Sequence, residues 1–595
     1  MTRNAAQATT SYTLNRGEQP QQSAAIGPAL KRLAPLLTDE KRLVATAFIG
    51  MLVTNVSGLL GPAIISRTVD RYIQNRNFTG VLLSAGVLLV VYLCGLIASY
   101  YQTLSMGTIG RVVLFKLRNM VFTKLQDLPL AFFNQNKAGD LISRINNDTD
   151  KLNQFFSQAL VQLSGNLFMM TGAAAFLLVL NVRLGLAALV PAAGVLIITQ
   201  ALSGWIKRKN LKSLQSLGGM SAEIQESLSN FKVIVAFNRL DYFRQKFNEA
   251  NERNFSASVA GGIANNLFMP IYGLAYNVAQ LIVLAYGIYM IGAGGLTVGL
   301  LIGFLLYVNS FYLPLRQLAM LWSSFQLALA SLDRISEVLA LESNMPLIAA
   351  APAKSGGGLL EFDKVQFSYP GGNEVLRDVS FTLESGKTYA LVGPTGGGKT
   401  TTASLMARLY DPTGGQVLLH GRDIRTYQPE ERTRKIGFIL QEPFLFTGTI
   451  RDNVLYGNEQ YREYSDDQLV ALLNERNVGA LLSRFDQGLQ TKIAAAGDAI
   501  SLGQKQLIAF MRAVLRDPEI LILDEATANI DTVTEQQLEQ ILDKLPPSTT
   551  KVIIAHRLNT IANADEIFFI NSGEIIPAGS MEHALDMLLH GKRVS

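Results

Sequence analysis

One stretch decides the fold of the C-terminal half of the chain: Thr388-Tyr-Ala-Leu-Val-Gly-Pro-Thr-Gly-Gly-Gly-Lys-Thr400. Its first five residues are a short, mostly apolar run, which predicts a buried strand. The rest matches G-x-x-x-x-G-K-[ST], a loop whose backbone N–H groups cradle phosphates. This motif requires a strand before it and a helix after it, and the sequence predicts both. The stretch therefore predicts a P-loop that binds a nucleoside triphosphate.

The residues of this loop have separate expected roles. The glycines let backbone N–H groups converge on phosphate oxygens at the start of a helix, where the helix dipole adds positive potential. Lys399 can reach the β- and γ-phosphates, and the Thr400 hydroxyl can ligate Mg²⁺. The nucleotide-binding residues expected here are Gly393, Thr395, Gly396, Gly397, Gly398, Lys399, Thr400 and Thr401.

A second motif supplies carboxylates. Glu519-Ile-Leu-Ile-Leu-Asp-Glu525 is a buried-strand pattern that ends in two acidic residues. Asp524 can hold Mg²⁺ through water, and Glu525 can orient or deprotonate an attacking water. An ordinary turn is the alternative reading of Asp-Glu after a strand, but the P-loop in the same chain favours the catalytic reading.

Further motifs make the C-terminal half resemble the ATP-binding cassette (ABC) proteins over about residues 357–590. Ile500-Ser-Leu-Gly-Gln504 is similar to the family signature L-S-G-G-Q, which implies nucleotide contacts by Ser501, Gly503 and Gln504. The resemblance also implies a Mg²⁺-touching Q-loop glutamine at Gln441, a switch histidine at His556 and an adenine-stacking aromatic at Tyr369. Ala528-Asn-Ile-Asp531 occupies the place of the D-loop. ATP and Mg²⁺ are the implied ligands, with Lys399, Glu525 and His556 as catalytic residues and with Thr400, Gln441 and Asp524 at the metal.

The N-terminal half has a different composition. The 595 residues are 49% hydrophobic and only 17% charged, against about 25% charged in soluble proteins. Residues 1–350 carry a net charge of +12 (28 Lys+Arg, 16 Asp+Glu), and residues 351–595 carry −7 (24 and 31), which together give +5. The single cysteine, Cys94, excludes an internal disulfide framework. We therefore expect a basic membrane domain and an acidic ATPase domain, with no nucleic-acid partner.

Uncharged stretches predict six membrane spans. Residues 43–66, 77–110, 152–182 and 184–206 each provide one, and residues 254–315 provide two, with a turn near Ile291-Gly-Ala-Gly-Gly-Leu296. The inner segments contain 22 Lys+Arg and the outer loops 4, which predicts cytoplasmic termini by the positive-inside rule. Residues 111–126 keep a helical apolar spacing, so the second helix should extend beyond the membrane.

The predicted architecture has two folded parts. We expect a disordered tail at 1–25, an all-α six-helix transmembrane domain with long cytoplasmic extensions at 26–345, a linker at 346–357 and an α/β P-loop nucleotide-binding domain at 358–595. Residues 132–144 and 223–238 are similar to the two coupling-helix regions of ABC exporters. The resemblance implies a half-transporter of a cell (plasma or inner) membrane, and we expect a bacterial source.

One departure from the family pattern bears on the partner. Leu502 replaces the first signature glycine, and a leucine adds bulk and removes conformational freedom where the backbone approaches phosphate. This pattern resembles one half of the heterodimeric exporters, so we expect a second half-transporter as partner; a homodimer that tolerates Leu502 remains the alternative.

The substrate is expected to be hydrophobic or amphiphilic: a drug, a lipid or a peptide. The spans contain scattered amides and Arg316, which either snorkels near the inner end of the sixth span or contacts substrate. An ATP-gated channel or regulator and an importer of exporter-like fold remain alternative functions. Six spans in the same chain argue against a soluble ABC ATPase.

Overall fold

The computed structural model describes residues 12–14, 38–349, 357–494, 500–524, 532–554 and 563–590. The chain forms two compact units. The helical unit consists of Asn15–Thr123 and Leu141–Leu339, and the α/β unit of Met1–Leu14, Lys124–Asp140 and Ala340–Ser595. The α/β unit thus includes two segments from the N-terminal half in addition to Ala340–Ser595.

The helical unit has the expected membrane spans. Within the described residues, six helical segments are long and apolar enough to cross a bilayer. They are Lys41–Ile73, Phe78–Gln126, Ala138–Leu180, Val182–Ser229, Leu240–Gly292 and Val298–Leu318. Each contains or overlaps one stretch that the sequence predicted, and the last two are separated by the expected glycine-rich turn.

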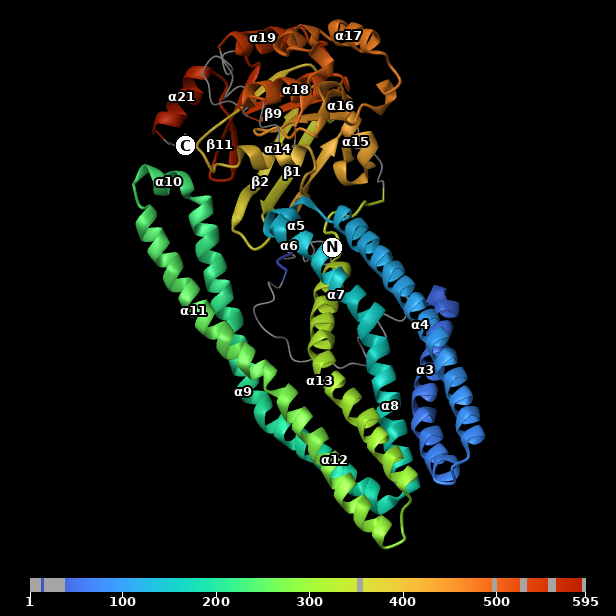
Figure 1. Cartoon of the computed structure of the whole chain (residues 1–595). Coiled ribbons are helices and arrows are strands. Elements are labelled where there is room, and N and C mark those ends of the chain that lie inside the picture. The colour runs from blue at the N-terminus through green and yellow to red at the C-terminus, as the bar shows by residue number, and fades with distance from the viewer. Residues whose placement is uncertain are drawn as a thin grey trace. The chain divides into compact units, whose positions relative to one another are not determined.

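These segments are built from helices of unequal length (Figure 1). The long ones are α3 (Lys41–Thr68), α4 (Phe78–Gln126), α8 (Leu160–Leu180), α9 (Val182–Ser229), α11 (Leu240–Asn266), α12 (Phe268–Gly292) and α13 (Val298–Ala340). The short helices α6 (Ala138–Ser143) and α7 (Thr149–Gln154) lie in the third segment, and α10 (Phe231–Ala236) lies between the fourth and the fifth. Helix α5 (Leu130–Gln135) lies between the second and third segments, in the part of the chain that belongs to the α/β unit. Single π-helical turns occur at Val69–Ile73, Arg144–Asp148 and Phe155–Ala159.

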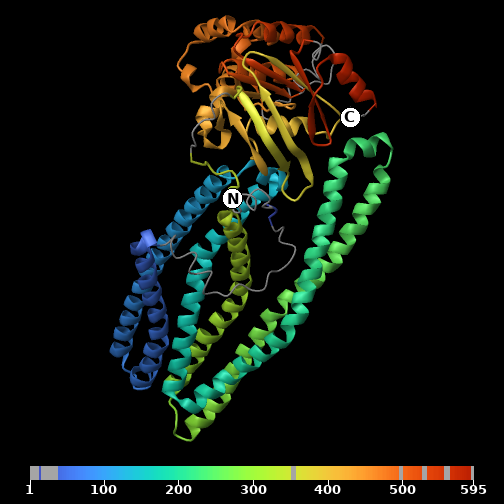
Figure 2. The ribbon, with the colours of Figure 1, turned by 180° about the vertical axis from the view of Figure 1, so that it is seen from behind.

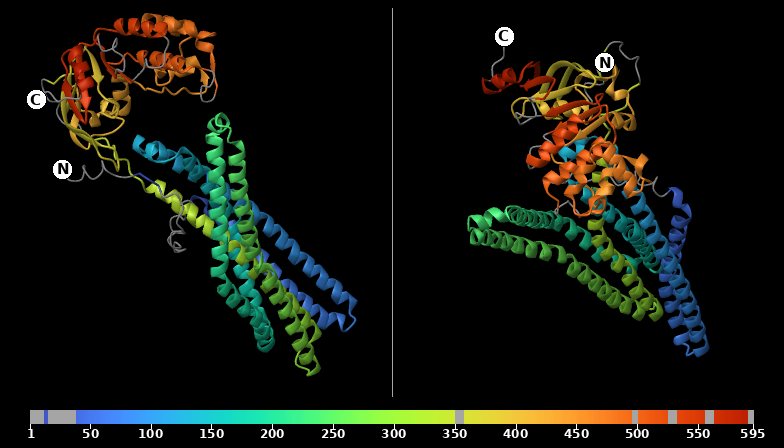
Figure 3. Two further views of the ribbon diagram at one scale, coloured as in Figure 1. Left: turned by 90° about the vertical axis from the view of Figure 1, so that its left-hand side faces the viewer. Right: turned by 90° about the horizontal axis from the view of Figure 1, so that it is seen from above.

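Several helices are much longer than a membrane is thick. At about 1.5 Å per residue, the 49 residues of α4 measure roughly 74 Å, whereas a hydrocarbon core is about 30 Å thick. The predicted helical extension through residue 126 is therefore confirmed. Helices α9 and α11 run side by side as a long pair that α10 closes at one end (Figures 1 and 3).

Buried polar groups fix the packing inside the helical unit. The buried Tyr307 hydroxyl donates to the Leu59 carbonyl at 2.7 Å, and the buried Tyr312 hydroxyl donates to the Ala188 carbonyl at 2.9 Å. Each tyrosine thus joins α13 to another helix while its hydroxyl stays satisfied in an apolar core.

Ion pairs hold the π-helical turn Arg144–Asp148 on α13. Arg144, fully buried, lies 2.8 Å from the Glu337 carboxylate and also donates to the Arg334 carbonyl. Asp148, also buried, accepts from Ser331 and pairs with Arg334 at 3.0 Å. Buried charges require such pairing, so this network fixes the backbone of residues 144–148 against α13.

The α/β unit contains two main sheets, seen from behind in Figure 2. An antiparallel sheet has the order β2-β1-β4-β5, and a six-stranded sheet has the order β12-β11-β3-β10-β9-β6, with parallel pairing from β11 to β6. The strands are β1 (Leu360–Ser368), β2 (Glu374–Leu383), β3 (Thr388–Val392), β4 (Gly414–Leu419), β5 (Arg422–Asp423), β6 (Ile436–Ile439), β9 (Ile520–Asp524), β10 (Thr550–Ile554), β11 (Glu566–Asn571) and β12 (Glu574–Pro577); a small ribbon pairs β7 (Gly448–Thr449) with β8 (Lys492–Ile493).

Helices accompany the sheets. They are α14 (Lys399–Met406), α15 (Pro429–Lys435), α16 (Ile450–Leu455), α17 (Asp466–Glu475), α18 (Leu502–Val514), α19 (Thr532–Asp543) and α21 (Met581–His590). Strand β3 is buried at every residue after Thr388, and β9 is buried throughout, because parallel strands are covered on both faces. The predicted α/β P-loop domain is confirmed.

Part of the N-terminal tail is ordered. Tyr12 and Leu14 are buried in the α/β unit, with 1% and 4% of their surface exposed. The expectation of a disordered tail at 1–25 therefore fails at these residues, because two apolar side chains within a polar segment find partners that composition does not reveal. The rest of that tail lies outside the described residues.

Candidate functional site

The phosphate-binding loop joins β3 to α14 as predicted. Gly393 adopts a φ of +149° and Gly398 a φ of +116°, a backbone region that L-residues with side chains rarely adopt. A Cβ on Gly393 would also overlap the carbonyl oxygen of Ile570. The glycines of the motif are therefore required by both backbone geometry and space, and the loop leads directly into the N-terminus of α14.

Lys399 is buried at the start of α14, with 6% of its surface exposed. Its ammonium group donates to the carbonyl oxygens of Gly393 and Pro394 at 2.8 and 3.0 Å. The lysine therefore folds over the loop that it belongs to, and its charge lies beside the backbone that would surround the phosphates. This is the position in which a P-loop lysine can act on β- and γ-phosphate oxygens.

Two oxygen donors for a cation lie close together. The Thr400 hydroxyl donates to the Asp524 carboxylate at 3.4 Å, although the two residues are 124 positions apart. Asp524 is the last residue of β9 and is 3% exposed. Hydroxyl and carboxylate oxygens are the hard ligands that Mg²⁺ prefers, so this pair fits a magnesium ion.

The strand order explains why these residues meet. Leu391 of β3 pairs with Ile554 of β10, and Ile554 pairs with Asp524 of β9. Strand β6 is the next neighbour of β9, and Gln441 follows its last residue by two positions. Ligands of open parallel sheets bind beyond the carboxyl ends of the strands, and P-loop, Asp524 and Gln441 all lie at that edge. Glu525 and His556, which directly follow β9 and closely follow β10, lie outside the described residues.

Tyr369 lies next to this site, just after β1. Its hydroxyl shares a 3.0 Å hydrogen bond with the Thr401 hydroxyl of α14, and its ring is half-buried. It meets the Tyr410 ring edge-on at 5.2 Å and 89°. Tyr410 in turn accepts a 2.7 Å hydrogen bond from Asn134 of α5, and burial raises the pKa of its hydroxyl. The structure thus places the predicted adenine-stacking residue beside the P-loop.

Sequence reasoning missed Tyr410 and Asn134. Neither belongs to a motif with a defined spacing, and their contact joins positions 276 residues apart. The sequence did identify the region that contains Asn134 as coupling-helix-like, but only the fold shows which tyrosine it reaches.

The signature forms the N-terminus of α18. The Ser501 hydroxyl accepts from the Gln504 N–H at 3.2 Å, and the Gln504 side chain accepts from the Ser501 N–H at 3.1 Å. This reciprocal capping box fixes the first turn, and Gly503 is buried within it. Leu502 is the first residue of the helix and is partly exposed. Ser501, Gly503 and Gln504 thus lie together at the start of α18, whereas the P-loop lies between β3 and α14.

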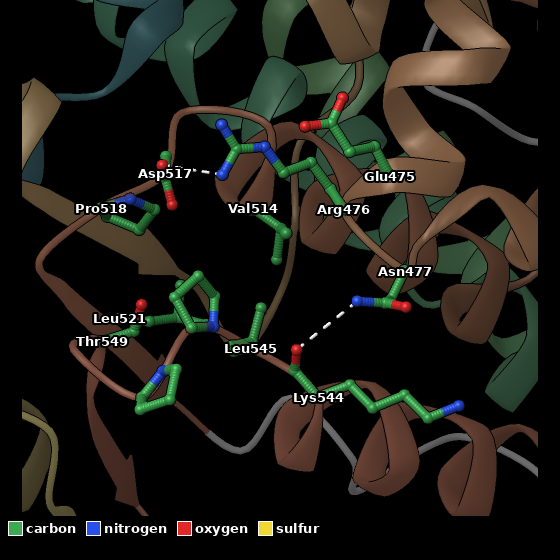
Figure 4. Close-up of a pocket in the computed structure, with 12 residues that line it drawn as sticks. Glu475, Arg476, Asn477, Val514, Asp517, Pro518, Leu521, Lys544, Leu545 and Thr549 are labelled. Carbon is green, nitrogen blue, oxygen red and sulfur yellow. Dashed lines mark hydrogen bonds and ion pairs between the residues drawn. The ribbon is translucent and has the colours of Figure 1, made fainter.

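A cavity of about 180 Å³ lies elsewhere in the α/β unit, between the end of α17, the end of α18 and the loop before β10 (Figure 4). Arg476 pairs with Asp517 at 2.7 Å at its wall, and Asn477 donates to the Lys544 carbonyl. None of the predicted nucleotide-binding residues lines it. The cavity is therefore separate from the candidate site.

Comparison with known proteins decides the family. Residues 44–315 match the family model described as the ABC transporter transmembrane region, and residues 376–528 match that of the ABC transporter. The chain is 33% identical over 564 residues to YfiC, an uncharacterized ABC transporter ATP-binding protein of Bacillus subtilis, covering 93% of this chain and 92% of the relative. The chain belongs to the ABC transporter family.

Two further relatives of this ABC transporter have named activities. A fatty acid ABC transporter ATP-binding/permease protein of Mycobacterium tuberculosis is 31% identical over 507 residues, 85% of this chain and 80% of the relative. A multidrug resistance ABC transporter ATP-binding and permease protein of Lactococcus lactis is 29% identical over 554 residues, 93% of each chain. The present transporter is thus an exporter-type half-transporter, a multi-pass membrane protein that binds ATP and couples its hydrolysis to transport.

Proposed function

We propose that the edge formed by the P-loop, Asp524 and Gln441 holds ATP with Mg²⁺. The observation that carries this proposal is the approach of the Thr400 hydroxyl to the Asp524 carboxylate at 3.4 Å. Backbone N–H groups at the start of α14 and the Lys399 ammonium bind phosphate oxygens, and Tyr369 stacks on adenine. When bound, Mg²⁺ neutralises phosphate charge and orients the triphosphate.

In this proposal, ATP hydrolysis depends on two residues that were identified from sequence motifs alone. Glu525 orients or deprotonates the attacking water, and His556 contacts the γ-phosphate end of the site; both roles rest on resemblance. Glu525→Gln should preserve ATP binding but lower turnover by about 100-fold, the order of magnitude of a lost general base. Lys399→Ala should instead weaken nucleotide binding. Near-normal turnover of the Glu525→Gln transporter would refute the assignment of the base.

We also propose that the partner is a different half-transporter. Leu502 supports this, because a leucine in the first turn of α18 stands where the family pattern has a glycine that lets backbone approach phosphate. One hydrolytic site then combines Lys399, Glu525 and His556 of this chain with the signature of the partner subunit.

The pairing is tested by purifying this chain alone in detergent and assaying ATPase activity. The heterodimer proposal expects turnover close to background, restored by co-expression with a half-transporter that has an intact L-S-G-G-Q. The informative variant is Leu502→Gly. If the lone chain hydrolyses ATP rapidly and Leu502→Gly changes nothing, the chain works as a homodimer and the proposal fails.

The proposed substrate is a hydrophobic or amphiphilic molecule. The names of two relatives, a fatty acid transporter and a multidrug resistance transporter, support this class. Proteoliposomes that contain the assembled transporter should show stimulated ATPase activity with a fatty acid or an amphiphilic dye and none with a hydrophilic sugar. Stimulation by the sugar alone would exclude the proposed class.

A further inference from the structure

Residues Tyr12–Leu14 lie against the α5 region, by which we mean α5 and the following Asn136, and side chains of that region bond to their backbone. The Tyr12 N–H donates to the Gln135 side-chain oxygen at 2.7 Å. The Asn136 carboxamide donates to the Tyr12 carbonyl at 2.9 Å and accepts from the Leu14 N–H at 3.1 Å. This carboxamide pairs with a peptide backbone through one donor and one acceptor, as another peptide group would.

The Tyr12 side chain joins the same place to a third segment. Its hydroxyl accepts from the Asn344 N–H at 2.8 Å and donates to the Glu342 carbonyl at 3.0 Å. Its ring meets the Phe132 ring edge-on at 6.3 Å, and both rings are buried. Burial raises the pKa of the Tyr12 hydroxyl, although the bond from Asn344 acts in the opposite direction. The hydroxyl is therefore a neutral group with both of its hydrogen-bonding roles satisfied.

The α5 region also contacts the candidate nucleotide site within the same unit. Asn134 donates to the Tyr410 hydroxyl, and Gln135 donates to the Pro370 carbonyl at 3.5 Å, next to Tyr369. A contiguous series of contacts therefore runs from Tyr12 through α5 to Tyr410, Tyr369 and the P-loop helix. Packed chains of this kind can carry energetic coupling between separated positions.

We propose that Tyr12–Leu14 is an N-terminal clasp that holds the coupling helix α5 on the ATPase body, and that Tyr12 is a positioning residue for ATP binding. The clasp joins residues 12–14, 132–136 and 342–344. More than a hundred residues of sequence lie between each of these segments and the next. It rests on the proposed role of Tyr369 and Lys399 in nucleotide binding. Within the described residues, the Tyr12 side chain contacts α5 and residues 342–344, and none of its hydrogen bonds or ring contacts is with a predicted nucleotide-binding residue.

The first test measures the clasp itself by hydrogen–deuterium exchange on the purified full-length chain, which requires neither partner nor substrate. Tyr12→Ala should raise amide exchange about tenfold or more across residues 130–136 and 342–344, without altering β3. Tyr427→Ala is the matched control, because Tyr427 is equally buried and its hydroxyl donates to the Leu419 carbonyl, away from α5. Unchanged exchange at 130–136 in Tyr12→Ala would overturn the proposal.

The second test measures affinity for a fluorescent ATP analogue in the same preparations. Tyr12→Ala should weaken binding roughly threefold to tenfold, and Tyr12→Phe should restore most of it, because the ring and the backbone bonds remain. Tyr427→Ala should leave the affinity unchanged. Lys399→Ala separates the two proposals: if it fails to weaken binding, the proposed nucleotide site is wrong, whereas weakening by Lys399→Ala but not by Tyr12→Ala rejects only the clasp.

Discussion

Tyr369 is the residue at which the site can be tested most directly. Base–aromatic stacking is worth about 1–3 kcal/mol, so Tyr369→Ala should raise the KM for ATP between about fivefold and a hundredfold. Tyr369→Phe keeps the ring and loses only the hydrogen bond to Thr401, so its KM should stay within about threefold of the wild-type value. ATPase titrations of the assembled transporter provide the measurement. If Tyr369→Ala and Tyr369→Phe raised the KM equally, ATP binding would depend on the Tyr369 hydroxyl and not on its ring.

Asp452 gives a prediction of pH dependence. Hydrogen bonds from the Thr449 backbone N–H and then from its hydroxyl lower the pKa of the Asp452 carboxyl. A group with a lowered folded-state pKa stabilises the fold above its unfolded pKa of about 4 and loses this contribution as the pH falls through the folded value. The difference in melting temperature between wild type and Asp452→Asn should therefore be larger at pH 7 than at pH 3. A difference independent of pH would contradict this assignment.

Single residues differ in how far sequence could predict them. Gly393 and Lys399 were identifiable because the P-loop constrains residue type and spacing together. Tyr12 was not identifiable, because its structural role depends on four hydrogen bonds and one ring contact with residues 120 to 332 positions away in the sequence. Averaged over a polar tail, one tyrosine and one leucine give no signal.

Helices α17 and α18 begin with the same pair of capping residues, a serine and a glutamine, so comparing them separates an effect on stability from an effect on function. Ser465 and Gln468 form a capping box at α17 like that of Ser501 and Gln504 at α18. Replacing either serine with alanine removes one cap and should cost about 1 kcal/mol of unfolding free energy. Ser501→Ala should additionally weaken nucleotide binding at the second site, where this signature faces the P-loop of the partner subunit, because only this serine lies in the signature.

Thermal melts and titrations with a fluorescent ATP analogue check this for the two alanine variants in the assembled transporter. The stability losses should agree within about 0.5 kcal/mol, and the nucleotide affinity of Ser465→Ala should remain near wild type. Should both variants lose affinity equally, the effect of Ser501 would be structural and its predicted contact with nucleotide would be unsupported.

Elements were predictable where one physical requirement acts along the whole segment. The extension of α4 to Gln126 follows from an apolar spacing that continues beyond the uncharged stretch. The π-helical turn at Arg144–Asp148 could not be predicted from such a pattern. Its backbone is fixed by buried ion pairs with α13, and these partners lie far away in the sequence. Short elements such as α5 likewise depend on tertiary partners, since six residues cannot form a stable helix alone.

At the scale of the whole molecule, the opposite net charges of the two halves become a prediction of topology. The basic residues of the N-terminal half cluster in the tail and in the two long segments between spans, which should keep these parts and both termini in the cytoplasm.

Cys94 is the single cysteine of the chain, so a Cys94→Ser background allows one reporter cysteine at a time. Two exposed glycines offer matched reporters: Gly218 within α9 and Gly295 between α12 and α13, neither of which has a positive φ.

A membrane-impermeant maleimide added to intact cells should label Gly295→Cys and leave Gly218→Cys unlabelled, and inside-out vesicles should reverse this pattern. The space around both positions admits a cysteine without overlap, so a difference in labelling reports the side of the membrane and not the fit of the side chain. Labelling of Gly218→Cys in intact cells would invert the topology and place the ATP-binding half outside the cell, where ATP is scarce. Such a result would remove the physical basis for ATP-driven export, because the charge distribution of the loops and the location of the nucleotide site both depend on this orientation.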